Sequence, residues 1–203
     1  MKYSTWRRTA LATGVLFVCL FAQGQQRMQK EVGLVVNASP EFGVAYNFGR
    51  NDWFGRIRGM VIYHNNPPTI NYDADTAKRG FYDIGLRLSG GLEGRFEMAE
   101  NVFFKCGLEL AFSYINTKQR AGHNQSEIVV SKAFAPALHL VLGAQYKFSK
   151  KWMFSAEILP FMEYRIDNQN RLPTQNELFN TLLDFNYGLN LQSLQVSLFY
   201  IIQ

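Results

Sequence analysis

The residues of this chain that could carry out chemistry are three histidines and a large set of charged side chains. His64, His123 and His139 are scattered, so they do not outline a catalytic centre, which would need a nucleophile beside a base. No metal-ligand spacing and no phosphate-binding loop is present in the sequence. The sequence therefore predicts a protein that is not an enzyme and uses no cofactor or metal.

The charged residues instead recur at alternate positions along several segments, between apolar residues. Positive and negative charges are nearly balanced, and buried charges need partners. This favours a self-neutralising network of ion pairs over a selective pore or ligand site, which would show a surplus of one sign. The predicted network comprises Arg56, Arg58, Asp83, Arg87, Glu93, Arg95, Lys105, Glu109, His139, Lys147, Glu157, Glu163 and Arg165, with Asp184 as a further candidate.

Residues 81–115 indicate which elements would position these charges. Two runs in which apolar and polar residues alternate lie on either side of a short turn. Successive side chains of a strand point to opposite faces, so we expect a β-hairpin with one apolar and one charged face. Each arm is much longer than the average globular strand of about 5 or 6 residues. A tilted strand needs about 9 to 11 residues to cross a bilayer core, so the hairpin is suited to cross a membrane.

Connector lengths predict how the remaining segments are arranged. Short links at residues 49–52, 98–101 and 149–151 alternate with long ones at residues 65–80, 116–126 and 167–176. This alternation is typical of an outer-membrane barrel with tight periplasmic turns and longer outer loops. With residues 32–36 as the first strand, the fold class is all-β, an eight-stranded antiparallel up-and-down transmembrane β-barrel. Both termini would then lie in the periplasm.

The last strand contains a phase slip near Gln192 and Ser193, where the apolar residues change from odd to even positions. We interpret the slip as a β-bulge, although a turn at residues 190–193 would add a strand. Residues 174–184 have some helical character, with Glu177 three residues after Thr174 as in a capping box. We assign them to the last outer loop.

The alternative to a membrane barrel is a secreted, lipocalin-like barrel with its apolar face inside. An eight-stranded barrel has interior room only for packed side chains or one small ligand, so the bulky apolar residues would overfill it. The opposite assignment also avoids lipid-facing Arg or Lys, which costs roughly 2 to 4 kcal/mol near the midplane. It sends inward the small residues Gly43, Ala45, Gly85, Gly91, Gly107, Ala111, Ala135, Ala137 and Gly143.

Aromatic residues gather at both ends of the predicted strands, as in the interfacial girdles of membrane barrels. Those beside the short turns are Phe48, Trp53, Phe54, Phe96, Phe103, Phe104, Phe148, Trp152 and Phe154. Those beside the long loops are Tyr63, Phe81, Tyr82, Tyr114 and Tyr164.

The N-terminus has the features of a secretory signal peptide, which we assign to residues 1–24, leaving residues 25–203 for the barrel domain. Lys2, Arg7 and Arg8 precede an apolar run and a small-x-small cleavage site that ends at Gly24. Cleavage would remove three cations and no acids, so the formal net charge of +5 gives no support for nucleic-acid binding. Only Cys106 of the two cysteines would remain, which excludes an internal disulfide.

With an export signal, amphipathic strands and short turns such as Ser149-Lys150-Lys151-Trp152, the chain resembles the porin-like outer-membrane β-barrel family, of the small OmpA/OmpX kind. The resemblance covers the whole barrel domain and rests on architecture. It implies residence in the outer membrane of a Gram-negative cell, contact with outer-membrane lipid, insertion by the barrel-assembly machinery and a surface-exposed role. The chain departs from that pattern at its end, Phe199-Tyr200-Ile201-Ile202-Gln203, where the machinery commonly favours a terminal aromatic.

The expected function is non-enzymatic: envelope structure, adhesion, or binding of an extracellular ligand or protein partner through the outer loops. The first alternative is a narrow channel or small-solute transporter that uses the charged lumen. Further alternatives are a secreted ligand-binding barrel and an accessory subunit of a secretion or uptake complex.

Overall fold

The computed structural model describes residues 28–39, 41–66, 69–70, 77–78, 81–121, 127–172, 180–190 and 193–202. The predicted signal peptide, His123 and parts of the three long links (residues 67–68, 71–76, 79–80, 122–126 and 173–176) lie outside the described residues. In the described ranges, no helix is long and apolar enough to span a membrane.

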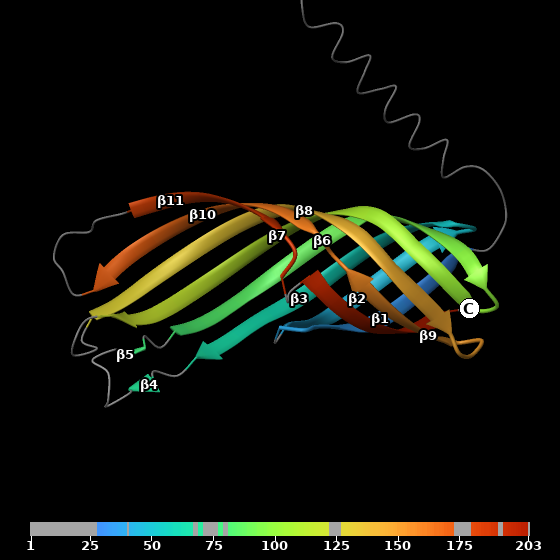
Figure 1. Cartoon of the computed structure of the whole chain (residues 1–203), viewed down its shortest axis with the longest axis horizontal. Coiled ribbons are helices and arrows are strands. Elements are labelled where there is room, and N and C mark those ends of the chain that lie inside the picture. Colours follow the sequence, from blue (N-terminus) through green and yellow to red (C-terminus); the bar gives the residue numbers. More distant parts are fainter. Residues whose placement is uncertain are drawn as a thin grey trace, which may run out of the picture.

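Eight crossings of the chain form one closed antiparallel barrel (Figure 1). Six crossings are β1 (Gln29–Asn37), β2 (Glu41–Arg50), β3 (Trp53–Asn66), β6 (Phe81–Ala99), β7 (Val102–Ala121) and β8 (Glu127–Lys147). The seventh consists of β9 (Trp152–Ile158) and β10 (Phe161–Leu172), and the eighth of β11 (Asn180–Gly188) and β12 (Leu194–Ile202). Each crossing pairs with the next, and β12 pairs with β1. The predicted eight-stranded up-and-down barrel is confirmed. A separate short pair, β4 (Thr69–Ile70) and β5 (Ala77–Lys78), follows β3.

The seventh and eighth crossings are interrupted side by side. The seventh breaks at Leu159 and Pro160, and proline cannot donate a ladder hydrogen bond. The eighth breaks next to it: the Ser193 amide donates to the Asn190 carbonyl at 3.0 Å, and the Leu159 amide donates to the Ser193 carbonyl at 2.7 Å. β11 pairs with β10 and β12 pairs with β9, so the break adds no strand. The extra strand in the alternative of a turn at residues 190–193 is therefore wrong, although the hydrogen bond between Ser193 and Asn190 is of the kind that closes a turn.

The strands reach farther toward the loop end than the alternation predicted. β7 continues to Ala121, β10 continues to Leu172, and β11 begins at Asn180 inside the segment that we assigned to a loop. Polar residues occupy both faces at these strand ends, as in Asn116-Thr117-Lys118, so the sequence shows no contrast between faces there. Backbone pairing continues regardless of that contrast.

The apolar residues face outward and the charged residues face inward. Leu108 is 56% exposed and Leu140 is 41% exposed, whereas Arg56 is only 2% exposed. An apolar surface of this extent is stable when lipid covers it. Two aromatic pairs mark its two ends: Trp152 with Tyr200, and Tyr63 with Tyr82. The predicted girdle position of Phe54 is wrong, because Phe54 is buried inside the barrel. Phe103, another predicted girdle residue, shares the inward parity of the buried Lys105 on β7.

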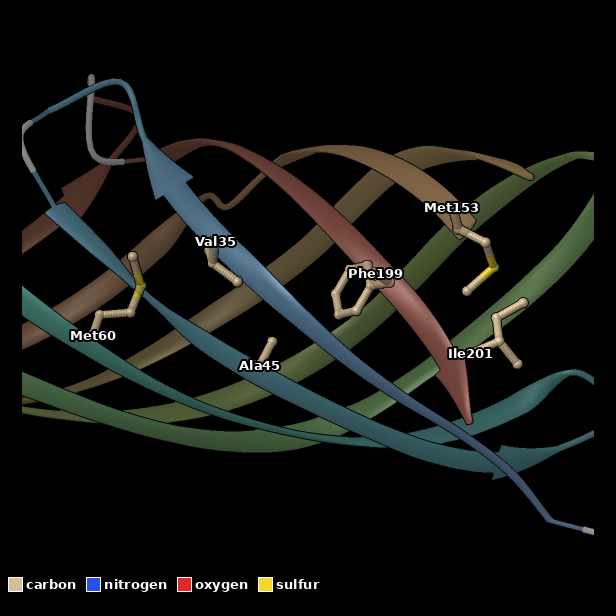
Figure 2. Close-up of a cluster of buried hydrophobic side chains, with 6 residues drawn as sticks. All are labelled: Val35, Ala45, Met60, Met153, Phe199 and Ile201. Carbon is tan, nitrogen blue, oxygen red and sulfur yellow. The ribbon is translucent and has the colours of Figure 1, made fainter. Parts of the chain in front are cut away.

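A small apolar cluster fills part of the interior along β1, β2, β3, β9 and β12 (Figure 2). Its members are Val35, Ala45, Met60, Met153, Phe199 and Ile201. The Phe199 ring lies against Gly33 on β1, where an added Cβ would be only 2.7 Å from the ring atom Cε1. Glycine at position 33 therefore makes room for an aromatic side chain inside the barrel.

Candidate functional site

The strand register places a glycine opposite each central carboxylate. Glu93 faces Gly107 and Glu109 faces Gly91 across β6 and β7, while Glu157 faces Gly143 across β8 and β9. A Cβ added at Gly107 would lie 2.7 Å from the Cα of Glu93, and one at Gly91 would lie 2.7 Å from the Cα of Glu109. No side chain fits at these positions. The glycines therefore leave the interior to the charged side chains beside them.

Arg56 on β3 is the centre of the interior cluster. Its Nη1 atom is 2.7 Å from Glu93 Oε2, its Nη2 atom is 2.7 Å from Glu157 Oε2, and its Nε atom is 3.0 Å from Glu109 Oε2. The three carboxylates come from β6, β9 and β7. One guanidinium therefore joins four strands across the barrel.

Two more cations extend the cluster toward the end with the short turns, where Arg95 on β6 lies opposite Lys105 on β7. The Lys105 ammonium lies 2.6 Å from Glu157 and 3.2 Å from Glu93. Arg95 contacts Glu31 at 2.6 Å and Glu93 at 2.7 Å.

An aromatic ring, an amide and an imidazole complete the surroundings of these ions. The Arg95 guanidinium stacks 3.6 Å above the Phe54 ring, which explains why that ring is inside. Arg58 pairs with Glu109 and donates to the Gln195 side chain. The Nδ1 atom of His139 is 3.7 Å from Glu109.

The charges of this buried cluster cancel. We call it the lumen network, and it contains four cations and four carboxylates: Arg56, Arg58, Arg95 and Lys105, with Glu31, Glu93, Glu109 and Glu157. Each of these residues is at most 6% exposed. Burying an ion is costly unless a partner compensates it, and here every ion has an opposite charge in contact. The network has no surplus charge, and its side chains are buried.

A second, smaller polar group lies near the β1–β2 turn. The Arg87 guanidinium is 2.9 Å from Glu41 and donates to the Ser113 hydroxyl at 2.9 Å. The Asn37 side-chain amide donates to the same Glu41 carboxylate at 2.7 Å. This group is electrically neutral as well.

The remaining predicted residues lie outside both groups. Arg165 is part of a pair with Asp167 on its own strand, 3.5 Å apart, and is about one-third exposed. Asp83 on β6, Glu163 on β10 and Lys147 on β8 are half-buried, and no ion pair joins them to the lumen network within the described ranges.

Sequence reasoning missed Glu31 and Glu41, which lie at the ends of β1 and β2. Their signal was present, because Glu31 is two residues before Gly33 and shares its inward parity. Glu31 was not predicted because the first predicted strand begins at residue 32. Glu41 was not predicted because it was expected to lie in a turn. Gln195 was missed because it directly follows the phase slip.

Few groups in the described residues could carry out chemistry other than ion pairing. Ser155 has its Oγ atom 3.4 Å from Lys105 Nζ, but both residues are fully buried and Lys105 is paired with Glu157. Across the part of the chain that the structure describes, no group of three His, Cys, Asp or Glu residues could hold a metal ion.

No protein-family model matches the chain, and no curated protein matches it. Among solved structures, the chain is similar to a major outer membrane protein from Thermus thermophilus, with 8% identity and a TM-score of 0.49, covering 86% of this chain and 98% of that chain. It is also similar to Neisserial surface protein A, with 11% identity and a TM-score of 0.33, covering 86% of this chain and 92% of that chain.

Proposed function

We propose that the protein is an integral outer-membrane β-barrel that is neither an enzyme nor an open channel. Its role would be envelope structure, adhesion or partner binding through the end of the barrel that carries the long strands. The observation that supports this proposal most strongly is the combination of an apolar outer surface with a buried, neutral lumen network. Lipid would cover the outer surface, and the network would hold the wall together from within.

The short links support the orientation of the barrel. Asn51-Asp52 and Glu100-Asn101 form two-residue turns, and Asn51 and Asn101 adopt positive φ values of 53° and 64°, which asparagine tolerates. Tight turns of this kind are typical of the periplasmic end of outer-membrane barrels. The signal peptide predicted at residues 1–24 and insertion by the barrel-assembly machinery are parts of this proposal.

The channel alternative has weaker support. A conducting lumen needs a water-filled path or a ring of one charge sign. The lumen network offers neither, because its side chains are buried and its charges cancel. We therefore assign the network a structural role.

Two measurements test the proposal together. Cell fractionation should recover the protein in the outer membrane, and its migration on gels should change on boiling, as expected for a stable barrel. Planar-bilayer recordings of the purified protein should show no discrete conductance steps. Recovery in the soluble periplasm would contradict the membrane assignment, and reproducible unitary currents would contradict the closed lumen.

A further inference from the structure

The wall of the barrel is incomplete on one side of the end with the long strands. β11 pairs with β10 from Asn180 to Gly188, and within the described part of the chain no strand pairs with its other edge. Across the gap, the end of β3 beyond Ile62 pairs only with β6, because β2 begins opposite Ile62. The β1–β2 hairpin is short, while β6, β7, β8 and β10 extend far beyond it (Figure 1).

The inner face of β11 is consequently uncovered. Leu182, which pairs with the inward-facing Asp167, is 51% exposed, and Leu183 on the opposite face is 63% exposed. In β12, where the wall is complete, the inward-facing Gln195 and Ser197 are buried. The exposure of the inner face of β11 therefore results from a missing neighbouring strand and not from an unusual sequence pattern.

An unpaired edge presents a row of backbone N–H and C=O groups that can pair with another strand. Proteins usually protect such an edge with lysine, proline or a bulge. β11 has the sequence Asn-Thr-Leu-Leu-Asp-Phe-Asn-Tyr-Gly, which contains neither lysine nor proline. Its pairing with β10 is also regular over the whole strand. The edge is open to strand addition.

The side chains around the edge indicate which strand would fit. The outer face of β11 is apolar, with Leu183, Phe185 and Tyr187 exposed. On the inner face, the exposed Asp184 lies directly opposite Arg165 of β10, and Glu163 and Asp167 lie diagonally on either side of it. Three carboxylates therefore surround one cation. The local charge is therefore negative. A strand with apolar residues on one face and basic residues on the other complements both sides.

A second copy of the chain does not provide such a strand by symmetry. Two barrels inserted in the same direction and related by a two-fold axis along the membrane normal place their β11 strands in the same direction. The edges would then meet in parallel at a large crossing angle, whereas every pairing in this barrel is antiparallel. A two-fold dimer therefore does not cover this edge, and the surrounding side chains fit a segment of a different polypeptide.

We infer that the free edge of β11 is a docking site for an extended segment of a partner protein, which adds antiparallel to β11 and alternates apolar with basic residues. This inference rests on the proposed function only in placing the long-strand end outside the cell. Binding is measured on purified protein in detergent micelles, so it succeeds or fails independently of cellular location.

The test uses a fluorescent nine-residue peptide that alternates valine and lysine, matched to the nine residues of β11. Its control has the same composition with the lysines in one block. We expect the alternating peptide to bind about tenfold more tightly, because only it can present one apolar and one basic face along a strand. It should also slow amide hydrogen exchange across residues 181–187. Equal binding of both peptides, or unchanged exchange in β11, would overturn the inference.

Charge variants locate the site. Asp184→Lys should weaken binding of the alternating peptide about tenfold, because it reverses a charge at the interface. Asp184→Asn should weaken binding less, because it only removes that charge. The matched control is Asp52→Lys, the same change at an exposed turn of the opposite end. Gel migration with and without boiling verifies that each variant folds. Equal losses in Asp184→Lys and Asp52→Lys would show unspecific attraction and contradict a site at β11.

Discussion

Arg56 shows how single residues hold this interior together. Its guanidinium contacts carboxylates from three other strands, and Lys105 contacts two of the same carboxylates. The removal of one member leaves its partners buried with fewer opposite charges in contact. Such a loss is more costly than the net contribution of the pair itself.

The first prediction concerns Glu157, which lies between Arg56 and Lys105. Glu157→Gln should lower the free energy of unfolding by about 3 to 5 kcal/mol, because two buried cations lose a shared counter-ion. Urea titration of the protein folded in lipid vesicles measures this change. Glu97→Gln is the control, because Glu97 is exposed and its loss should change stability by less than about 0.5 kcal/mol. Equal effects of the two substitutions would contradict the network.

The second prediction concerns the glycines opposite the carboxylates. Gly107→Ala should destabilise the barrel by about 1 to 3 kcal/mol, because the new Cβ meets the Leu92 carbonyl and the backbone of Glu93.

Gly90→Ala serves as its control, since the nearest atom to a Cβ there is 3.8 Å away. It should be neutral or stabilising by about 0.4 to 1 kcal/mol, because alanine restricts the unfolded chain more than glycine does. The same urea titration distinguishes the two variants. A neutral Gly107→Ala would mean that the interior has more room than the register implies.

The alternation of the sequence predicted which residues face inward but not which pairs they form. Parity alone places Arg56, Glu93 and Glu157 on the same side of the wall. Their contacts depend on the register between strands far apart in the sequence and on side-chain rotamers, and neither is encoded locally. Phe54 was assigned to the outside because aromatic residues near a turn suggest a girdle. Its stacking under Arg95 is a tertiary contact that no local pattern contains.

At the level of elements, the outer surface of each strand is matched to lipid. Leu108 on β7 lies between Phe104 and Phe112 on the same outward face, and all three are exposed. This continuous apolar strip predicts that a charge will be tolerated at its ends and not at its middle.

The third prediction tests that strip. Leu108→Arg should destabilise the folded barrel in lipid by roughly 2 to 4 kcal/mol, because arginine would lie near the midplane. Met98→Arg at the short-link end should cost only about 0 to 1 kcal/mol, because that position is near the interface. Equilibrium unfolding in vesicles compares both with the parent protein. If the two variants lost the same stability, the strip would not lie in lipid.

The central stretches of the strands were predictable because each has one apolar and one polar face. The strands were predicted to end too early at the loop side. Residues there, such as Thr117 and Lys118, show no contrast between faces and yet pair with β8. The phase slip near Ser193 was visible in the sequence. Its structural form was not, because the break depends on Pro160 in the neighbouring crossing and on the hydrogen bond between Leu159 and Ser193.

For the whole molecule, strand register sets the tilt of the wall. Register partners followed once around the barrel lead from Val196 through Val36, Val61 and Phe134 to Leu183, a different position on the same crossing. Such a stagger is required to close a barrel of tilted strands. The alternation cannot predict it, because it depends on how each pair of strands slides relative to the next.

The orientation of the two faces is the central claim, and Cys106 provides a probe for it. Cys106 shares the outward parity of Phe104 and Leu108 on β7. A chain that begins after Gly24 has no other cysteine, so a nitroxide spin label attaches at this position alone. A label at position 150, on the exposed short turn, serves as the reference in a Cys106→Ser background.

Electron paramagnetic resonance in lipid vesicles then measures how often each label collides with dissolved oxygen and with a water-soluble nickel complex. The account predicts that the label at Cys106 collides mainly with oxygen and is shielded from nickel, as in a bilayer interior, while the label at position 150 shows the reverse. A Cys106 label that nickel reaches as readily as the turn label would contradict it.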